Sequence, residues 1–395
     1  MARRGSDYYY DENRRVQRER PKGAGRTLFL WLVDVVMGVI TCLAAVALIG
    51  GILARVVNPE VTAIFVFAGL FYQVIYLVNL ACALWWVVRW RRLFLLSTLM
   101  LIVGGSSIGL FYRSDLKRKS TEEVRTREDV TIVSYNVRDF CSDVEGENNY
   151  ERVAEWLNGL GAHIVCLQEA SFSSSRSFGD FKDKLKRLEY GFFTHSSPEG
   201  GEEQVGSGYA LFSAYPIVRH RVADVDSLNV NGVWADVKMG RDTIRVFNLH
   251  LQSTGIKGEG RRVALSNNDA EDTLAHTNLS DVVDKVVDSY RKRAVEVRNI
   301  ASLVEESRHP VVVCGDFNDT PVSYAYGQFR SAGLVDAFVE KGRGAEYTFN
   351  GLFNLFRIDY ILPEGEAFEV RSYNSYDLDY SDHKPIVATI RPIRK

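Results

Sequence analysis

Three long apolar segments follow one another in the first 112 residues, and the rest of the chain is much more polar. They run over Thr27–Ala54, Val61–Val88 and Leu93–Tyr112. Crossing a hydrocarbon core of ~30 Å takes about 20 helical residues, so each segment predicts a transmembrane helix. A cleaved signal peptide would be shorter and would not be followed by two more such segments. We predict a basic cytoplasmic tail (1–26), three transmembrane helices (27–112), a juxtamembrane stalk (113–129) and one further domain (130–395).

The Lys and Arg residues that flank these segments predict the orientation, because cytoplasmic loops carry an excess of them. The tail carries eight basic residues and the loop after the second segment carries three, whereas the loop between the first two has only Arg55. This distribution predicts a cytoplasmic N-terminus and an extracytoplasmic domain. Four basic residues between Arg113 and Lys119 argue for the opposite orientation, but they form the smaller group. Asp34, inside the first segment, lies near its polar end, and we assign it no role.

The remaining residues, 113–395, form an acidic part. Residues 1–112 hold 12 Lys/Arg and 6 Asp/Glu, which leaves 36 basic and 44 acidic residues, a net charge of −8. Such a part lacks the broad positive field of non-specific nucleic-acid binding. It also repels anionic substrates unless a metal ion reverses the sign locally. The five cysteines show no metal-ligand spacing and suggest no disulfide framework.

Residues 130–395 combine many short strand patterns with a few helical ones. Two amphipathic helices are predicted over Asn149–Leu160 and Asp284–Glu306. Two hairpins are predicted, one joining Tyr209–Ser213 to Val218–Ala223 and one joining Val233–Met239 to Thr243–Leu251. This content predicts an α/β (α+β) fold, a four-layer αββα sandwich of two mainly antiparallel sheets. Residues 255–279 form a polar insertion, either a lid or a surface loop without a role.

Polar residues stand at the ends of six predicted strands. The clearest strand, Val311–Gly315, is followed by Asp316 and Asn318. Each polar end taken alone is explained as a turn, a cap or a core histidine. Taken together they predict one site, because ligand sites lie at strand ends in layered α/β proteins. The other ends carry Asn136, Glu169, Asn248 with His250, Asp359, and Asp382 with His383.

The chemistry of this set predicts a metal-assisted reaction. Four carboxylates and several amides, without thiolates, suit Mg²⁺, or Mn²⁺, better than zinc. Two histidines supply an acid and a base near neutral pH.

The order of these residues resembles the endonuclease/exonuclease/phosphatase superfamily. That superfamily includes DNase I-like nucleases, abasic-site endonucleases, inositol-polyphosphate 5-phosphatases and neutral sphingomyelinases. The most specific matches are Gly315-Asp316-Phe317-Asn318 and Ser381-Asp382-His383. The resemblance covers about residues 130–392 and leaves the apolar segments outside.

The resemblance implies which residues hold the metal and which face the phosphate. Glu169 would be the principal Mg²⁺ ligand, with Asn136 and Asp382 beside it. Asp316 would orient or deprotonate the attacking water. Asn318 would hold a phosphate oxygen.

The resemblance also implies roles for the two histidines. His383, oriented by Asp359, would contact the phosphate or act as a base. His250 would protonate the leaving group, with Asn248 beside it as support or as a phosphate contact. Arg138 departs from the pattern, because several nucleases carry an acidic or amide residue there. It would grip a substrate phosphate or pair with Asp139.

These observations predict a membrane-anchored, Mg²⁺-dependent phosphoesterase that hydrolyses a phosphodiester or phosphomonoester. Three alternatives stay open: a nuclease acting on extracytoplasmic DNA, a lipid head-group phosphodiesterase, and a catalytically inactive membrane interaction module. The net charge and the lack of an aromatic and basic track weigh modestly against bulk DNA degradation. No protein partner is predicted.

Overall fold

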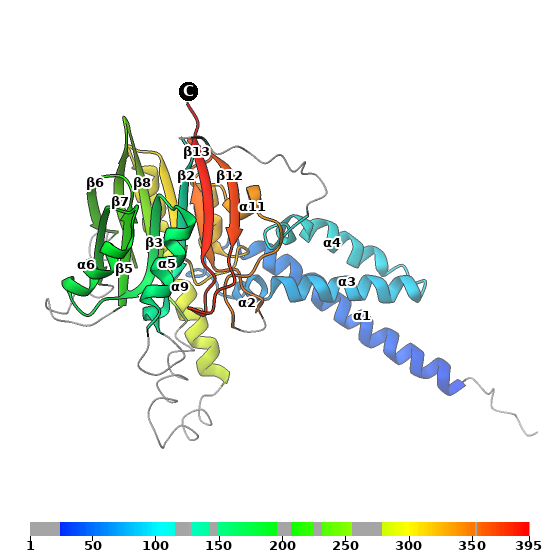
Figure 1. The fold of residues 1–395 in the computed structure, drawn as a ribbon. Helices are drawn as coiled ribbons and strands as arrows, with labels where there is room; N and C mark the ends of the chain where they lie inside the picture. The colour runs from blue at the N-terminus through cyan, green and yellow to red at the C-terminus, as the bar shows by residue number, and fades with distance from the viewer. Residues whose placement is uncertain are drawn as a thin grey trace, which may run out of the picture.

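The computed structural model describes residues 24–114, 126, 128–141, 148–195, 207–223, 231–254, 279–351 and 354–394. It joins four apolar helices, called the helical unit below, to a sandwich of two sheets (Figure 1). The basic tail to residue 23, most of the stalk (115–125 and 127) and residues 255–278 of the insertion lie outside the described residues. The helical unit consists of α1 (Ala24–Leu53), α2 (Val66–Leu70), α3 (Tyr72–Val88) and α4 (Phe94–Ile108).

The two sheets are mainly antiparallel, as predicted. The six-stranded sheet has the order β12 (Phe368–Ser375), β13 (Ile386–Pro392), β2 (Val130–Asn136), β3 (Ile164–Ser171), β5 (Ser207–Ser213) and β4 (Tyr190–His195). The five-stranded sheet has the order β11 (Asp359–Pro363), β9 (Val311–Asp316), β8 (Asp242–His250), β7 (Gly232–Met239) and β6 (Ile217–Val222). Among the described strands of these two sheets, β2–β3 and β8–β9 are the parallel pairs.

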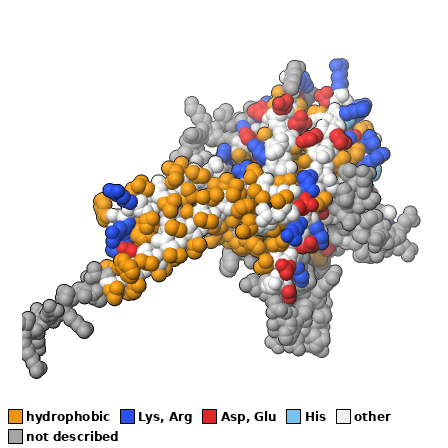
Figure 2. Space-filling model, turned by 180° about the vertical axis from the view of Figure 1, so that it is seen from behind, with side chains coloured by type: hydrophobic (Ala, Val, Ile, Leu, Met, Phe, Trp, Pro, Cys, Tyr) orange, Lys and Arg blue, Asp and Glu red, His pale blue; other side chains and the backbone are white. Residues whose placement is uncertain are grey.

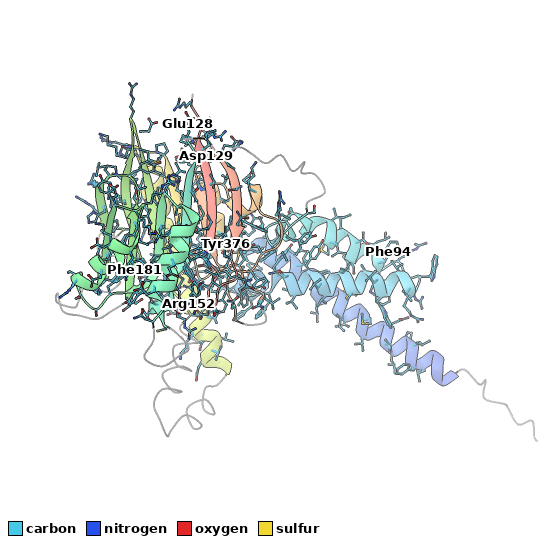
Figure 3. All side chains as sticks on the ribbon, viewed as in Figure 1. Phe94, Glu128, Asp129, Arg152, Phe181 and Tyr376 are labelled. Carbon is cyan, nitrogen blue, oxygen red and sulfur yellow. The ribbon has the colours of Figure 1, made fainter. Side chains whose placement is uncertain are left out.

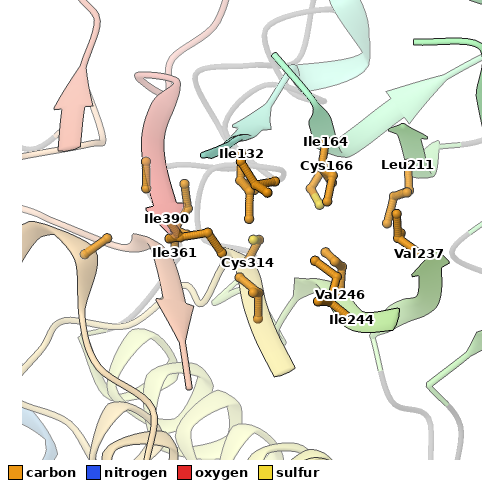
Figure 4. Close-up of a cluster of buried hydrophobic side chains, with 14 of the residues drawn as sticks. Ile132, Ile164, Cys166, Leu211, Val237, Ile244, Val246, Cys314, Ile361 and Ile390 are labelled. Carbon is orange, nitrogen blue, oxygen red and sulfur yellow. The ribbon is translucent and has the colours of Figure 1, made fainter. Parts of the chain in front are cut away.

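Helices cover both outer faces, so the sandwich has four layers. Along β2, Ile132 points into the core between the sheets and Val133 into the core under the helices, as the two-residue period of a strand requires. Figure 4 shows the inter-sheet core, where Cys166 and Cys314 approach each other from opposite sheets. The six-stranded sheet is covered by α5 (Tyr150–Leu160) and α6 (Ser175–Lys184), and the five-stranded sheet by α9 (Leu279–Glu305) and α10 (Tyr324–Ser331).

One predicted hairpin is wrong. β5 pairs with β3 and β4, whereas β6 pairs with β7 in the other sheet. The Tyr215-Pro216 turn therefore connects the two sheets instead of joining neighbours. A local turn pattern cannot distinguish these outcomes, because both place a reversal between two strands. The hairpin of β7 and β8 is confirmed.

The prediction of three membrane-spanning helices is also corrected. By length and composition, one described helix, Leu28–Leu53 with 26 residues, could cross a membrane. The apolar helices α3 and α4 have 17 and 15 residues. The second predicted segment is shortened because its first part forms turns and the short α2, which breaks from α3 at Phe71 (φ −98°, ψ 22°). The third ends early because Tyr112–Arg113 (β1) pairs with Gly344–Ala345 (β10).

Asp34 gains a partner in this arrangement. Its carboxylate accepts two hydrogen bonds from the Arg89 guanidinium, at 2.9 and 2.8 Å. The bidentate pair ties α1 to the end of α3, and the Arg91 guanidinium lies 3.7 Å away. We read this pair as a structural tie between helices.

The helical unit docks directly on the sandwich. Gln73 donates a 2.8 Å hydrogen bond to the Leu355 carbonyl, and the buried Arg357 donates one of 2.9 Å to the Leu110 carbonyl. Arg298 of α9 pairs with Glu60, between α1 and α2. The helices of the helical unit therefore contact the sandwich directly, and most of the predicted stalk lies outside the described residues.

Candidate active site

The register of three neighbouring strands brings the first site residues together. In the five-stranded sheet, His250 at the end of β8 stands opposite Asp316 at the end of β9, and Asp316 stands opposite Asp359 at the start of β11. In the other sheet, Asn136 ends β2 next to β3. Figure 3 labels Asp129, beside the start of β2, at one end of the sandwich and Arg152 at the other. The site lies at the end toward Arg152.

Asp316 is the centre of the cluster. Its side chain is fully buried. Its Oδ2 accepts a 3.1 Å hydrogen bond from the Asn136 amide and lies 3.6 Å from His250 Nε2 and 3.7 Å from His383 Nε2. Its Oδ1 accepts a 2.8 Å hydrogen bond from the Asn318 backbone N–H. Two imidazoles and an amide from three different segments therefore converge on one carboxylate.

His383 and Asp359 form a buried ion pair behind Asp316. The Nδ1 of His383 lies 3.0 and 3.2 Å from the two Asp359 oxygens, and Thr348 accepts hydrogen bonds from the backbone N–H groups of Ile358 and Asp359. Burial alone would lower the pKa of His383, but the carboxylates of Asp359 and Asp316 outweigh it and raise that pKa to about 10. Burial raises the pKa of Asp359 to about 6, against the opposing charge of His383. The two carboxylates thus favour the protonated form of His383.

Two of the predicted metal ligands, Asn136 and Glu169, are joined to Asp316 through the Asn136 amide. The Asn136 amide donates a 3.1 Å hydrogen bond to Glu169 Oε1, and a third of the Glu169 side chain (32%) is exposed. Ser381 donates a 2.7 Å hydrogen bond to the Asn136 carbonyl, which holds the segment carrying the half-buried Asp382 against the end of β2. Asn136 and Glu169 are therefore in contact, with Asp382 on the adjoining segment.

A second group of residues could also hold an ion. Ligand atoms of Asp316, Asp359 and His383 lie within 4.8 Å of one another. All three side chains are buried, whereas a third of the Glu169 side chain is exposed. The exposed Glu169 side of the site fits a hydrated Mg²⁺ better, because its donors are oxygens and water can reach it.

The turn after β9 depends on backbone conformations that few residues adopt. Gly315 has φ 145°, and a Cβ there would lie 1.9 Å from the Leu249 carbonyl oxygen. Asn318 has φ 50°, in the left-handed region. Its side-chain amide donates a 3.0 Å hydrogen bond to the Leu251 carbonyl. The turn therefore fixes Asn318 beside Asp316 and beside the end of β8.

Two predicted phosphate contacts lie in different surroundings. Asn248 is fully buried between the sheets and donates to the carbonyls of Leu167 and Ala210, both at 3.0 Å, while accepting from Gln168. Both of its amide hydrogens are thus used within the protein, which favours support over substrate contact. Arg138 is half-buried beside Asn136, whose Oδ1 accepts the Arg138 backbone N–H at 3.1 Å.

His250 sits at the edge of the cluster. Its side chain is 20% exposed, and its Nε2 lies 3.5 Å from Glu169 Oε1. The segment that follows it is held by Glu296 of α9, which accepts hydrogen bonds from the Gln252 backbone N–H (2.9 Å) and the Asn231 amide (2.7 Å). Burial raises the pKa of Glu296 to about 7, against the opposing effect of these bonds and of Arg293 and His250.

The sequence analysis missed the residues that support the site from α9. Arg293 is buried and donates a hydrogen bond to the Asn318 carbonyl. Glu296 holds the segment after His250. Both lie among the apolar positions of α9, between Tyr290 and Val297. A charged residue that interrupts an apolar stripe is the signal that could have found them.

Comparison with known proteins places these residues within one family model. Residues 133–383 match the Endonuclease/Exonuclease/phosphatase family, so the match runs from β2 to His383. Residues 34–111, in the helical unit, match a domain of unknown function (DUF8431). No curated protein matches the chain.

Several solved structures are similar to the sandwich. An endonuclease/exonuclease/phosphatase from Beutenbergia cavernae is 18% identical, with 67% of this chain and 72% of that chain covered and a TM-score of 0.49. A mannosyl-6-phosphatase from Bacteroides thetaiotaomicron is 19% identical, with 67% and 100% covered and a TM-score of 0.46. An AP endonuclease from Archaeoglobus fulgidus is 17% identical, with 66% and 98% covered and a TM-score of 0.45. Likeness at this level carries no information on substrate.

Proposed function

We propose, from the premise that this chain belongs to the Endonuclease/Exonuclease/phosphatase family, that it is a membrane-anchored, Mg²⁺-dependent phosphoesterase. The observation that carries the proposal is the convergence of Asn136, His250 and His383 on the buried Asp316. A buried carboxylate ringed by hydrogen-bond donors is suited to orient a water and take its proton. Its neighbours then face the phosphoryl group that this water attacks.

The metal would be held by Glu169, Asn136 and Asp382, with Mn²⁺ as the alternative ion. The donors are oxygens, and the Glu169 carboxylate is open to solvent, which fits a hard cation that keeps several waters. When bound, such an ion offsets negative charge on the phosphoryl oxygens. The net charge of −8 in residues 113–395 makes this local reversal of sign necessary for an anionic substrate.

The protein's own groups divide the remaining work. His383, kept protonated by Asp359 and Asp316, acts as a fixed cation toward a phosphate oxygen, which favours this role over that of a base. His250, the more exposed imidazole, protonates the leaving group. Asn318 and Arg138 are the candidate amide and guanidinium contacts to phosphate oxygens.

Hydrolysis of generic phosphoesters by the full chain in detergent tests this function. We expect bis(4-nitrophenyl) phosphate or 4-nitrophenyl phosphate to be cleaved with Mg²⁺ or Mn²⁺, and cleavage to stop when a chelator is added. Restoration by Mg²⁺ after chelation is the control for damage to the protein. A chain that binds no Mg²⁺ and cleaves neither compound would instead be an inactive interaction module.

The membrane anchor is supported by the exposed apolar surface of the helical unit. Apolar side chains cover the helical unit where it projects from the sandwich in Figure 2. Lys and Arg side chains gather at the end of the unit far from the sandwich. Examples are Leu43, Val46 and Ile102, exposed by 65%, 69% and 72%. A contiguous apolar surface of this kind is expected to be covered by lipid. We propose that α1 spans the bilayer with α3 and α4 beside it, the tail being cytoplasmic and the sandwich extracytoplasmic.

A lipid head group is the substrate class that one further observation favours. The helical unit contacts the wall of the site: Leu70 packs in one cluster with Phe349, and the Phe349 ring lies 5.2 Å from the His383 ring. An anchor held this close to the catalytic residues keeps the site near the membrane surface. Vesicle phospholipids and supercoiled plasmid, offered to the same preparation, distinguish this class from a nuclease. Release of a head group without plasmid nicking, abolished by Asp316→Ala, is the expected result.

A further inference from the structure

One loop of the sandwich enters the core of the helical unit. Val322, six residues after Asp316, is fully buried in a cluster with Leu48, Tyr72 and Met100 of α1, α3 and α4. This loop side chain is thus part of the packing of the apolar helices. The loop that begins at Asp316 therefore ends in the core of the helical unit.

The backbone of α2 lies against the same loop. A Cβ added to Gly69 would lie 2.4 Å from the Val322 carbonyl oxygen, so only glycine allows this approach. The Thr320 hydroxyl donates a hydrogen bond of 3.3 Å to the Gly69 carbonyl. Two loop residues, Thr320 and Val322, are thus held at one point of α2.

Arg293 of α9 holds the loop from the other side. Its guanidinium donates to the Asn318 carbonyl, lies 3.9 Å from an Asp319 oxygen and covers the Tyr290 ring at 4.0 Å. Tyr290 in turn packs against Val66 of α2. The side chain that fixes Asn318 is therefore itself supported by the helical unit.

We propose that the helical unit is a positioning part of the catalytic centre: residues 318–322 are clamped between Arg293 and Gly69, and docking of α2 sets the geometry of Asp316 and Asn318. This inference rests on the proposed phosphoesterase function. The inference follows from the short distance along the chain between the site and the helical unit. Asp316 Oδ1 accepts a hydrogen bond from the Asn318 N–H, and only three residues separate Asn318 from Val322. Displacing reacting groups by ~1 Å costs about 10²-fold in rate, so a loosened clamp lowers turnover more than substrate binding.

The test uses the full chain in detergent micelles with Mg²⁺ and bis(4-nitrophenyl) phosphate, a substrate that needs no membrane. Gly69→Ala forces α2 away from the loop, and Val322→Ala removes the loop side chain from the helical core without a clash. Two matched controls disturb the same unit away from the loop. Trp86→Ala removes a buried side chain whose indole donates a 2.8 Å hydrogen bond to the Thr41 hydroxyl, and Arg89→Met removes the ion pair with Asp34; neither residue belongs to the Val322 cluster.

We expect Gly69→Ala and Val322→Ala to lower kcat about 10-fold or more with KM within about twofold, on the scale of a small displacement. The two controls should keep kcat within about twofold at similar losses of Tm. Equal losses of kcat in the clamp variants and in the controls would show that the clamp acts only through the overall stability of the fold. That result would overturn the inference. So would unchanged kcat in both clamp variants.

A second measurement does not depend on activity. Amide hydrogen exchange of residues 317–324 should quicken in Gly69→Ala and Val322→Ala and stay unchanged in the two controls. Unchanged exchange in the clamp variants would overturn the inference even if the chain proved inactive on every substrate. Failure of the unsubstituted chain to cleave any phosphoester would count against the proposed function alone.

Discussion

Asp316 is the residue on which the charges of the site converge, and its surroundings decide what it can do. No water-exposed surface remains on its side chain, yet it keeps an amide, two imidazoles and a backbone N–H as neighbours. These partners supply the hydrogen bonds that a buried polar group needs in place of water. The proposed water would meet it from the side of Glu169 and His250, the two more exposed members of the cluster.

Replacing Asp316 by Asn keeps the shape of the side chain and removes its basicity. We expect kcat to fall by about 10²- to 10⁴-fold, the usual contribution of a general base, with little change in KM. Steady-state hydrolysis of bis(4-nitrophenyl) phosphate measures both constants. Asp236→Asn is the matched control, since it also removes a buried carboxylate, one paired with Arg245 at 2.8 Å in the middle of the sheet. A loss confined to KM would contradict the assigned role.

Glu296 makes the stability of the chain dependent on pH. Burial raises its pKa in the folded state from 4.5 to about 7. The folded state therefore binds this proton more tightly, so the contribution of Glu296 to stability is fully present below pH 4.5 and is lost as the pH rises through 7. The loss is about 3 kcal/mol. Thermal unfolding should show the Tm of the unsubstituted chain, relative to that of Glu296→Gln, falling between pH 4.5 and 7.5.

The exposed Glu155 of α5 provides the control for this experiment. Glu155→Gln removes a carboxylate that folding does not bury. Its Tm should follow that of the unsubstituted chain across the same pH range, and a parallel course for Glu296→Gln would contradict the burial argument.

At the scale of the elements, the close approach of β8 and β9 defines the floor of the site. Parallel pairing of these strands aligns His250 with Asp316, and the absence of a side chain at Gly315 lets the Leu249 carbonyl lie against the β9 backbone. Any other residue at 315 would push apart the two strands that carry the proposed acid and base.

Gly315→Ala should therefore destabilise the fold by more than about 4 kcal/mol, the range of severe packing faults. Gly240→Ala is the control, because Gly240 also has a positive φ (65°) but has open space around its Cβ position. Its cost should be only about 1 kcal/mol, from backbone strain. Chemical denaturation of both variants in one detergent compares the two, and equal costs would show that the strand approach is not the cause.

The elements also show how far sequence reasoning reached. Asp316, Asp359 and His250 could be predicted to meet because each stood at the end of a recognisable strand, and strand ends align in a sheet. Arg293 and Glu296 could not be predicted, because a helical position does not reveal which loop the helix will face. The Tyr215-Pro216 connection was misassigned because a turn does not encode which sheet its strands join. The shortness of α3 was missed because hydropathy does not detect the break at Phe71.

At the scale of the whole molecule, the helical unit and the sandwich form one body with two surfaces of opposite character. Apolar side chains cover the unit, whereas charged side chains are spread over the sandwich (Figure 2). The end of α3, with Arg89, lies at the far end of the unit from the sandwich (Figure 1). If the helical unit crosses the bilayer, the end that carries Arg89 and the end that contacts the sandwich face opposite compartments.

Accessibility labelling in intact cells tests this orientation. Arg241→Cys, in the β7–β8 turn of the sandwich, should react with a membrane-impermeant maleimide, and Arg91→Cys should react only after the cells are opened. The unsubstituted chain controls for its own cysteines, of which Cys42 is exposed on α1. The reverse pattern would place the sandwich in the cytoplasm, and labelling of both in intact cells would argue against a spanning anchor.

The burial of Val322 in the helical unit bears on how such a protein could be released from its membrane. Cleavage between residues 114 and 126 would sever the chain here but leave α2 docked and the loop held. Extraction of the helices would expose the cluster around Val322 and free the loop that carries Asp316. Shedding would therefore switch this protein off, and its activity would be confined to the surface where it is anchored.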